Sequence, residues 1–109
     1  MEDKRVFARI DTKFPLRFLD LNSGREGEAE TIDVSANGLG LVTNEPLAPQ
    51  TPLEMWLRIP DQHEPLYTRG EVVWSRAVDG GERQRIGVRL LKAELMGLAR
   101  VLWLQREAA

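Results

Sequence analysis

The segment LYTRGEVVWSRAVDGGERQRIGVRLL, residues 66–91, decides the fold of this chain. Residues 66–77 have the pattern of a long strand, with Val73 near its centre. Asp79-Gly80-Gly81 is typical of a hairpin turn, and residues 85–91 return to a strand pattern. The segment therefore predicts two antiparallel neighbours in a β-sheet.

The chain before this hairpin predicts more strands. Phe14, Leu16 and Phe18 lie at alternate positions, which fits a strand that begins near Pro15. Asn-Gly at 37–38 favours positive φ and a tight turn between two later strands. The strands predicted before the hairpin cover residues 14–21, 26–34, 39–43 and 53–59.

After the hairpin, the apolar residues recur with a different spacing. Apolar residues at 91, 95, 98 and 102 follow helical spacing and predict an amphipathic helix of about four turns, at about 92–105. Six short strands followed by one helix predict an antiparallel barrel or sandwich with the helix packed on it. Residues 1–13 show no clean period, so we expect a flexible basic arm there and a single domain over residues 14–109.

Composition excludes several classes of function. The 109 residues suffice for one domain, and the absence of cysteine excludes a disulfide scaffold, a cysteine nucleophile and a cysteine-ligated metal. His63 is the one histidine, so a multi-histidine metal site or Ser–His catalysis is hard to build. We therefore expect no enzyme, no metal and no cofactor.

Charge and hydropathy indicate the partners and the compartment. The net charge of −2 argues against a nucleic-acid-binding protein. No segment has the roughly 18 apolar residues of a membrane span, and the first residues lack the apolar run of a signal peptide. We expect a cytoplasmic protein that does not insert into a membrane.

The basic arm carries the first candidate binding motif. Arg5 and Arg9 are spaced as RxxxR, and Lys4 precedes them. A guanidinium forms bidentate hydrogen bonds with phosphate oxygens or with the O6/N7 edge of guanine, whereas lysine adds charge without this fork. The motif is therefore a candidate anion site, and the alternative interpretation is a solvated basic terminus.

The turn after residues 26–34 carries the second motif, Asp33-Val34-Ser35-Ala36-Asn37-Gly38. A carboxylate can accept hydrogen bonds from the N1/N2 edge of guanine, and a serine hydroxyl can donate to phosphate. Gly38 would let the backbone come close to a ligand. The alternative is a turn held by local side-chain hydrogen bonds, with no ligand.

The two motifs together resemble the PilZ domain family, which binds the bacterial second messenger cyclic di-GMP. The family signatures RxxxR and [D/N]xSxxG are both intact, in the right order and about the right distance apart. Residues 39–41, 70–76 and 85–90 also resemble family strands, so the resemblance covers nearly the whole chain. Lys4 stands where many members have arginine, and Leu90 where the last strand often has phenylalanine.

The resemblance implies a six-stranded antiparallel β-barrel with a C-terminal α-helix. It also implies that the arginines clamp phosphates and guanine edges, and that Asp33 and Ser35 pair with a guanine and its neighbouring backbone. Trp74 matches a tryptophan that lies beside a guanine in some members, with a core position as the alternative. The residues implied to bind cyclic di-GMP are Lys4, Arg5, Arg9, Asp33, Ser35, Asn37, Gly38 and Trp74.

The function implied by the resemblance is a non-catalytic receptor, monomeric or homodimeric, that relays the signal by ordering of the arm and through a protein partner. A PilZ-like scaffold in pilus or motility machinery, which acts by protein contacts without nucleotide, is the alternative. A small barrel that binds single-stranded nucleic acid would need a longer basic groove with aromatic platforms. The few aromatic residues and the acidic segment 20–33 argue against it.

Overall fold

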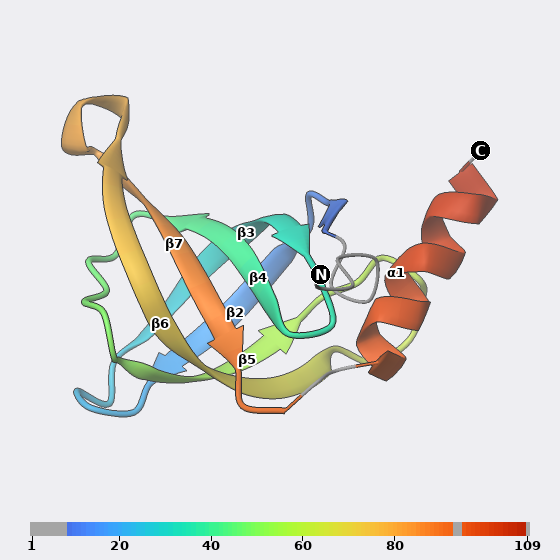
Figure 1. The fold of residues 1–109 in the computed structure, drawn as a ribbon, viewed down its shortest axis with the longest axis horizontal. Helices are drawn as coiled ribbons and strands as arrows, with labels where there is room; N and C mark the ends of the chain where they lie inside the picture. The colour runs from blue at the N-terminus through green and yellow to red at the C-terminus, as the bar shows by residue number, and fades with distance from the viewer. Residues whose placement is uncertain (1–8, 93–94, 109) are drawn as a thin grey trace, which may run out of the picture.

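The computed structural model describes residues 9–92 and 95–108, and Figure 1 shows a strongly curved sheet with one helix at its end. The strands pair in the order β1-β3-β2-β5-β6-β7-β4, and a further pairing of β3 with β4 closes the sheet. The result is a closed six-stranded antiparallel barrel with one additional strand outside it and a short C-terminal helix. The predicted fold is confirmed.

The six barrel strands all lie on segments that the sequence predicts, with small shifts at their ends. Strand β1 was not predicted. It lies within the segment predicted as an arm and pairs with the end of β3. The helix was predicted at about 92–105 and is observed at Leu95–Ala108. The elements are β1 (Ile10–Asp11), β2 (Pro15–Asp20), β3 (Glu26–Val34), β4 (Gly38–Thr43), β5 (Pro52–Leu57), β6 (Leu66–Val78), β7 (Arg83–Leu90) and α1 (Leu95–Ala108).

The core fills the inside of the barrel with one face of every barrel strand. In β2 and β5 alternate residues are buried, as the period of two requires. The largest side chains with almost no exposure are Phe18, Leu39, Leu41, Leu53, Met55, Ile86 and Val72. Because both edges of the sheet are paired, the barrel leaves no long exposed edge among its described strands.

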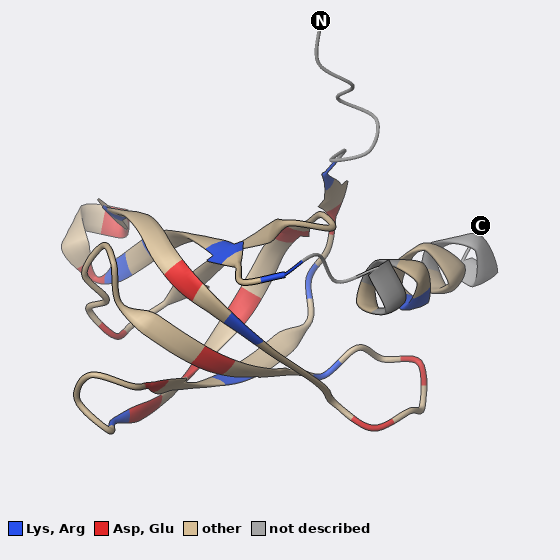
Figure 2. Cartoon of the chain, turned by 60° about the horizontal axis from the view of Figure 1, so that its bottom comes forward, with Lys and Arg blue, Asp and Glu red and all other residues tan. Residues whose placement is uncertain are grey.

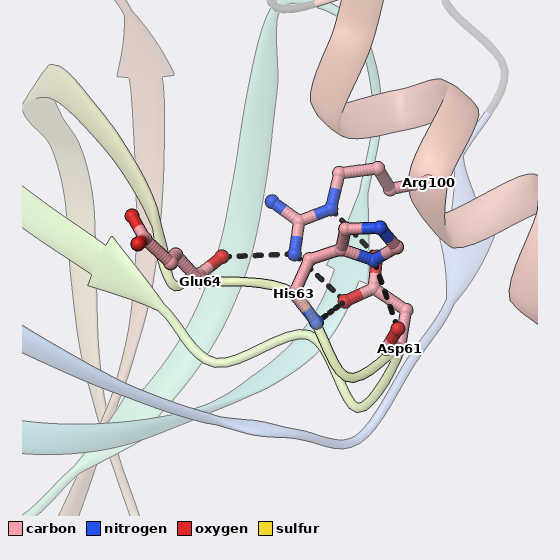
Figure 3. Close-up of polar contacts among 4 residues, drawn as sticks. All are labelled: Asp61, His63, Glu64 and Arg100. Atoms are coloured by element: carbon pink, nitrogen blue, oxygen red, sulfur yellow. Dashed lines mark hydrogen bonds and ion pairs between the residues drawn. The ribbon is translucent and has the colours of Figure 1, made fainter.

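The helix is held against one end of the barrel by an apolar contact and an ion pair. Val101 is buried and belongs to the core cluster. Arg100 donates to both carboxylate oxygens of Asp61, at 2.6 and 2.7 Å, and to the carbonyl oxygen of Glu64 at 2.9 Å. Figure 3 shows the guanidinium of Arg100 directed into the loop between β5 and β6. No helix in the described residues is long and apolar enough to span a bilayer.

The turn between β3 and β4 differs from the sequence expectation. Neither Asn37 nor Gly38 has a positive φ, so the prediction of a left-handed Asn-Gly turn is wrong. Glycine is needed at position 38 for another reason. A Cβ there would lie 2.6 Å from the carbonyl oxygen of Val88, so a side chain would push β4 away from β7. The close approach of two strands, and not the turn conformation, selects this glycine.

The hairpin between β6 and β7 does use left-handed glycines. Gly80 and Gly81 have φ of 69° and 96°, within a short 3₁₀ turn that starts at Asp79. Figure 1 shows this hairpin (gold to orange) extending from the barrel at the end away from helix α1. The predicted hairpin turn is therefore confirmed at Asp79-Gly80-Gly81.

Candidate functional site

Four residues form one continuous row across the outer surface of the barrel. Asp33 of β3 pairs with Gly40 of β4, Gly40 pairs with Gly87 of β7, and Gly87 pairs with Trp74 of β6. Neighbouring strands are about 4.8 Å apart, so Asp33 and Trp74 are separated by about 14 Å along the row. Asp33 of the second motif and the predicted tryptophan therefore share one face of the barrel.

The two glycines leave room for the side chains at the ends of the row. A Cβ at Gly40 would lie 2.8 Å from Oδ1 of Asp33, and a Cβ at Gly87 would overlap the indole of Trp74. The carboxylate thus lies over one glycine and the indole over the other. No further side chain projects from the row between the carboxylate and the indole.

Both ends of the row are turned outward by irregular strand geometry. The register shifts between Thr31 and Asp33 in β3, and between Val72 and Trp74 in β6. Thr31 and Val72 are buried, so a strict period of two would also direct Asp33 and Trp74 into the core. The extra residue at each shift reverses the alternation and exposes both side chains, which is the usual effect of a β-bulge next to a binding site.

The predicted arginine and carboxylate are in contact. Nη1 of Arg9 donates to Oδ1 of Asp33 at 2.8 Å, and the backbone N–H of Gly40 donates to the same oxygen at 3.0 Å. The side chain of Arg9 is 53% exposed and that of Asp33 is 19% exposed. The end of the RxxxR motif is therefore joined to the start of the DxSxxG motif. Lys4 and Arg5 lie outside the described residues.

Arg9 is positioned by the segment that follows it. The backbone N–H of Thr12 donates to the carbonyl of Ile32 at 3.0 Å, and its hydroxyl donates to Oγ1 of Thr31 at 2.7 Å. The backbone N–H of Phe14 donates to the same threonine oxygen at 3.0 Å. These bonds attach the chain to β3 at its bulge, immediately beside Asp33.

The other residues of the second motif build the turn. Ser35 is buried, and both its backbone N–H and its hydroxyl donate to the carbonyl of Gly38, at 2.8 and 3.2 Å. Asn37 is exposed, and its carbonyl accepts from the N–H of Leu90 at 2.7 Å. Ser35 and Asp33 are thus close in the chain, but the hydroxyl faces the turn while the carboxylate lies on the row.

Trp74 lies outside the core. It is 41% exposed, and the guanidinium carbon of Arg76 lies 5.5 Å from the centre of its ring. A half-exposed indole offers a π-face for stacking, and the neighbouring cation favours electron-rich or anionic partners. Of the two positions considered for Trp74 from the sequence, the structure has the exposed one.

The sequence analysis did not identify Gly40, Gly87 or Arg76 as site residues. The glycines occur in the strand segments that resemble the family, but only the strand registers show that they lie between Asp33 and Trp74. His63 is exposed, and its ring contacts Asp61, beside helix α1. Within residues 9–92 and 95–108, no cluster of His, Asp and Glu could hold a metal ion.

The comparisons with known proteins identify the family of this chain. The sequence model of the PilZ domain matches residues 3–105, and this chain belongs to the PilZ domain family. A search of curated protein sequences gave no match. The closed six-stranded barrel with its C-terminal helix is a PilZ-like fold.

Several solved structures have the same fold. The Escherichia coli YcgR PilZ domain with c-di-GMP is 18% identical, with a TM-score of 0.71 over 97% of this chain and 95% of that one. The Bacillus subtilis inhibitor of motility MotI/DgrA is 15% identical, with a TM-score of 0.72 over 98% of this chain and 52% of that one. K. pneumonia MrkH is 20% identical, with a TM-score of 0.65 over 95% and 48%. This chain therefore spans about half the length of MotI/DgrA and of MrkH.

Proposed function

We propose that this protein is a non-catalytic receptor for cyclic di-GMP, which binds on the row between Asp33 and Trp74. The observation that carries the proposal is the contact of Arg9 with Asp33, because it joins the two family motifs at one place on the barrel. Membership of the PilZ family and the fold shared with the YcgR domain that holds c-di-GMP support it.

The chemistry of the row fits the parts of the ligand. A carboxylate accepts from the N1 and N2 donors of guanine, and a guanidinium binds phosphate or the O6/N7 edge in bidentate form. The exposed indole of Trp74 can stack on a guanine, and the two glycines make room for the carboxylate and the indole against the barrel. Lys4 and Arg5 would add charge from the preceding part of the arm. Ser35, Asn37 and Gly38 would shape the turn under the ligand.

We expect binding to change the contact between Arg9 and Asp33. Asp33 keeps the N–H of Gly40 as a donor when Arg9 moves, so its carboxylate does not lose all partners. Arg9 is more than half exposed, so a phosphate can attract its guanidinium at little cost in desolvation. We propose that the ligand thereby orders the arm against the barrel, and that a protein partner reads the ordered form.

The helix is placed to take part in this relay. A small apolar cavity of about 20 Å³ lies between Ser35 and Gly38 of the turn and Gly97 and Val101 of helix α1. Thr12 of the arm and Val101 of helix α1 line a second hollow. Because both hollows border the helix, we expect a shift of the turn or of the arm to change the packing around helix α1.

Titration calorimetry with cyclic di-GMP tests the proposal. We expect binding by the wild type and a loss of affinity of at least about tenfold in Arg9→Ala, since one charge-assisted hydrogen bond is lost. Arg25→Ala is the matched control, because Arg25, directly before β3, also forms an exposed ion pair, with Glu45 at 3.6 Å, away from the row. A wild type that takes up no cyclic di-GMP would favour the alternative scaffold that acts by protein contacts alone.

A further inference from the structure

Beside Trp74, two arginines face each other across β6 and β7. Arg76 and Arg85 are direct partners in the register of the two strands, two residues along from the pair of Trp74 and Gly87, with the pair of Ser75 and Ile86 between them. Both side chains are exposed. Like charges directly opposite each other in an antiparallel pair destabilise the sheet. This arrangement therefore has a cost in the free protein that the fold itself does not require.

The neighbouring arginines on the same face show how such a charge is usually compensated. Arg83 donates to Asp79 at 2.8 Å, and Arg89 donates to Glu71 at 2.7 Å. Among the residues that the structure describes, Arg76 and Arg85 form no ion pair with an acidic group. The uncompensated pair thus lies between two compensated arginines.

The groups around the pair leave its positive charge in place. On the far side of Arg85, its partner on β4 is the neutral Val42, and Val42 in turn pairs with Glu30 of β3. The guanidinium of Arg76 lies over the ring of Trp74, which stabilises a cation without neutralising it. Figure 2 shows basic and acidic residues interspersed over the strands, so a local excess of positive charge is a departure from the general pattern.

We propose that Arg76 and Arg85 form a phosphate subsite at the Trp74 end of the row, opposite the Arg9 end. This inference rests on the proposed binding of cyclic di-GMP and assigns to these two arginines one phosphodiester group of that ligand. Two guanidinium groups can bind one phosphate through several charge-assisted hydrogen bonds, and the phosphate removes their mutual repulsion. The subsite lies beside the indole, so a guanine stacked there would have its phosphate within reach of both cations.

Calorimetry with cyclic di-GMP on Arg76→Gln and Arg85→Gln tests the subsite. We expect each variant to lose about tenfold in affinity or more, and Arg85→Lys to recover part of the loss because it restores the charge without the fork. Since both arginines would bind the same phosphate, the double variant should lose less than the product of the two single losses. Arg83→Gln is the control and should bind as the wild type does, because Asp79 already neutralises Arg83.

Thermal unfolding separates this role from a structural one. Removal of one charge relieves the repulsion, so Arg85→Gln should unfold at the same temperature as the wild type or at a higher one while its affinity falls. If both glutamine variants bind with wild-type affinity while Asp33→Ala binds poorly, the subsite is wrong and the proposed function stands. If the wild type binds no cyclic di-GMP, both are wrong.

Discussion

Arg100 of helix α1 holds Asp61 of the β5–β6 loop through two hydrogen bonds of 2.6 and 2.7 Å, across 39 positions in the sequence. The side chain of Asp61 is 9% exposed and that of Arg100 is 21% exposed. The contact is therefore bidentate and largely shielded from water, unlike the ion pairs of Arg9, Arg25, Arg83 and Arg89. It joins the helix to the loop between β5 and β6, beside the apolar contact that Val101 makes with the core.

Asp61→Asn should weaken the attachment of helix α1. An amide cannot form the bidentate ion pair, and Arg100 would keep a partly buried charge, so we expect a loss of about 1–3 kcal/mol in the free energy of unfolding. Urea denaturation followed by circular dichroism measures it. Asp79→Asn is the control, because the pair of Asp79 with Arg83 is exposed and should contribute under about 1 kcal/mol. Equal losses in the two variants would contradict the importance of the Asp61 contact.

The same pair predicts a dependence of stability on pH. The hydrogen bond from Arg100 holds the pKa of Asp61 well below its usual value of 3.8, despite the opposing effect of burial. A carboxyl group with a lowered pKa in the folded state stabilises that state above the pKa of the unfolded chain. The stabilisation is lost as the pH falls from about 4 towards the lower, folded-state pKa.

The measurement is the difference in unfolding free energy between the wild type and Asp61→Asn as a function of pH. We expect a constant difference from about pH 5 to pH 8, and a smaller one below about pH 4. A difference that grows on acidification would have the wrong sign for an ion pair.

Gly87→Ala should impair ligand binding by displacing Trp74. A Cβ at Gly87 would overlap the indole, so the ring has to leave its place on the row. We expect a loss of affinity for cyclic di-GMP of about tenfold, from the loss of a stacked guanine. Calorimetry gives the affinity, and tryptophan fluorescence reports the displacement of the ring.

Gly24→Ala is the control for that substitution. Gly24 has a φ of 77°, and a Cβ there would meet no atom within 4 Å. The substitution should therefore cost about 1 kcal/mol in stability through backbone strain and leave the affinity unchanged. If Gly87→Ala changed stability and fluorescence but left the affinity intact, Trp74 would have no part in binding.

Ser35→Ala separates the two roles considered for this hydroxyl. In the free protein the hydroxyl donates to the carbonyl of Gly38, so its single proton is already in use. Its removal should cost about 0.5–1.5 kcal/mol in the free energy of unfolding. We expect a smaller loss of affinity than in Arg9→Ala, measured by the same titration. A loss as large as that of Arg9→Ala would indicate that the hydroxyl changes partner and donates to the ligand.

The alternation of apolar residues was enough to predict the six barrel strands, because one face of each strand fills a closed interior. Strand β1 was missed, since its two residues are too few to show a period. The row of the site could not be predicted from the motifs alone. It depends on the registers of β3, β4, β7 and β6, which are set by pairing between segments far apart in the chain.

The exposure of Trp74 illustrates the same limit. Counting by two from the buried Val72 places Trp74 in the core, and the core was the alternative left open from the sequence. The bulge that reverses this result depends on how β6 pairs with β7, and no residue type in GEVVWSR requires it. The sequence predicts an exposed position more clearly for Asp33, because burying a carboxylate in the core without partners is too costly. The sequence could therefore identify Asp33 as a site residue with less ambiguity than Trp74.

Binding of cyclic di-GMP should slow hydrogen exchange in residues 1–13, because the proposed mechanism places the arm on the ligand. Thr12 and Phe14 already donate backbone or side-chain hydrogen bonds to β3, so the largest change is expected before Ile10. Amide exchange by mass spectrometry, with and without saturating ligand, measures it. Residues 52–57 of β5 are the internal control, since they lie on the opposite wall and pair only with β2 and β6. Equal exchange of the arm in the two states, with calorimetry showing a bound ligand, would rule out closure of the arm and leave helix α1 as the element that responds.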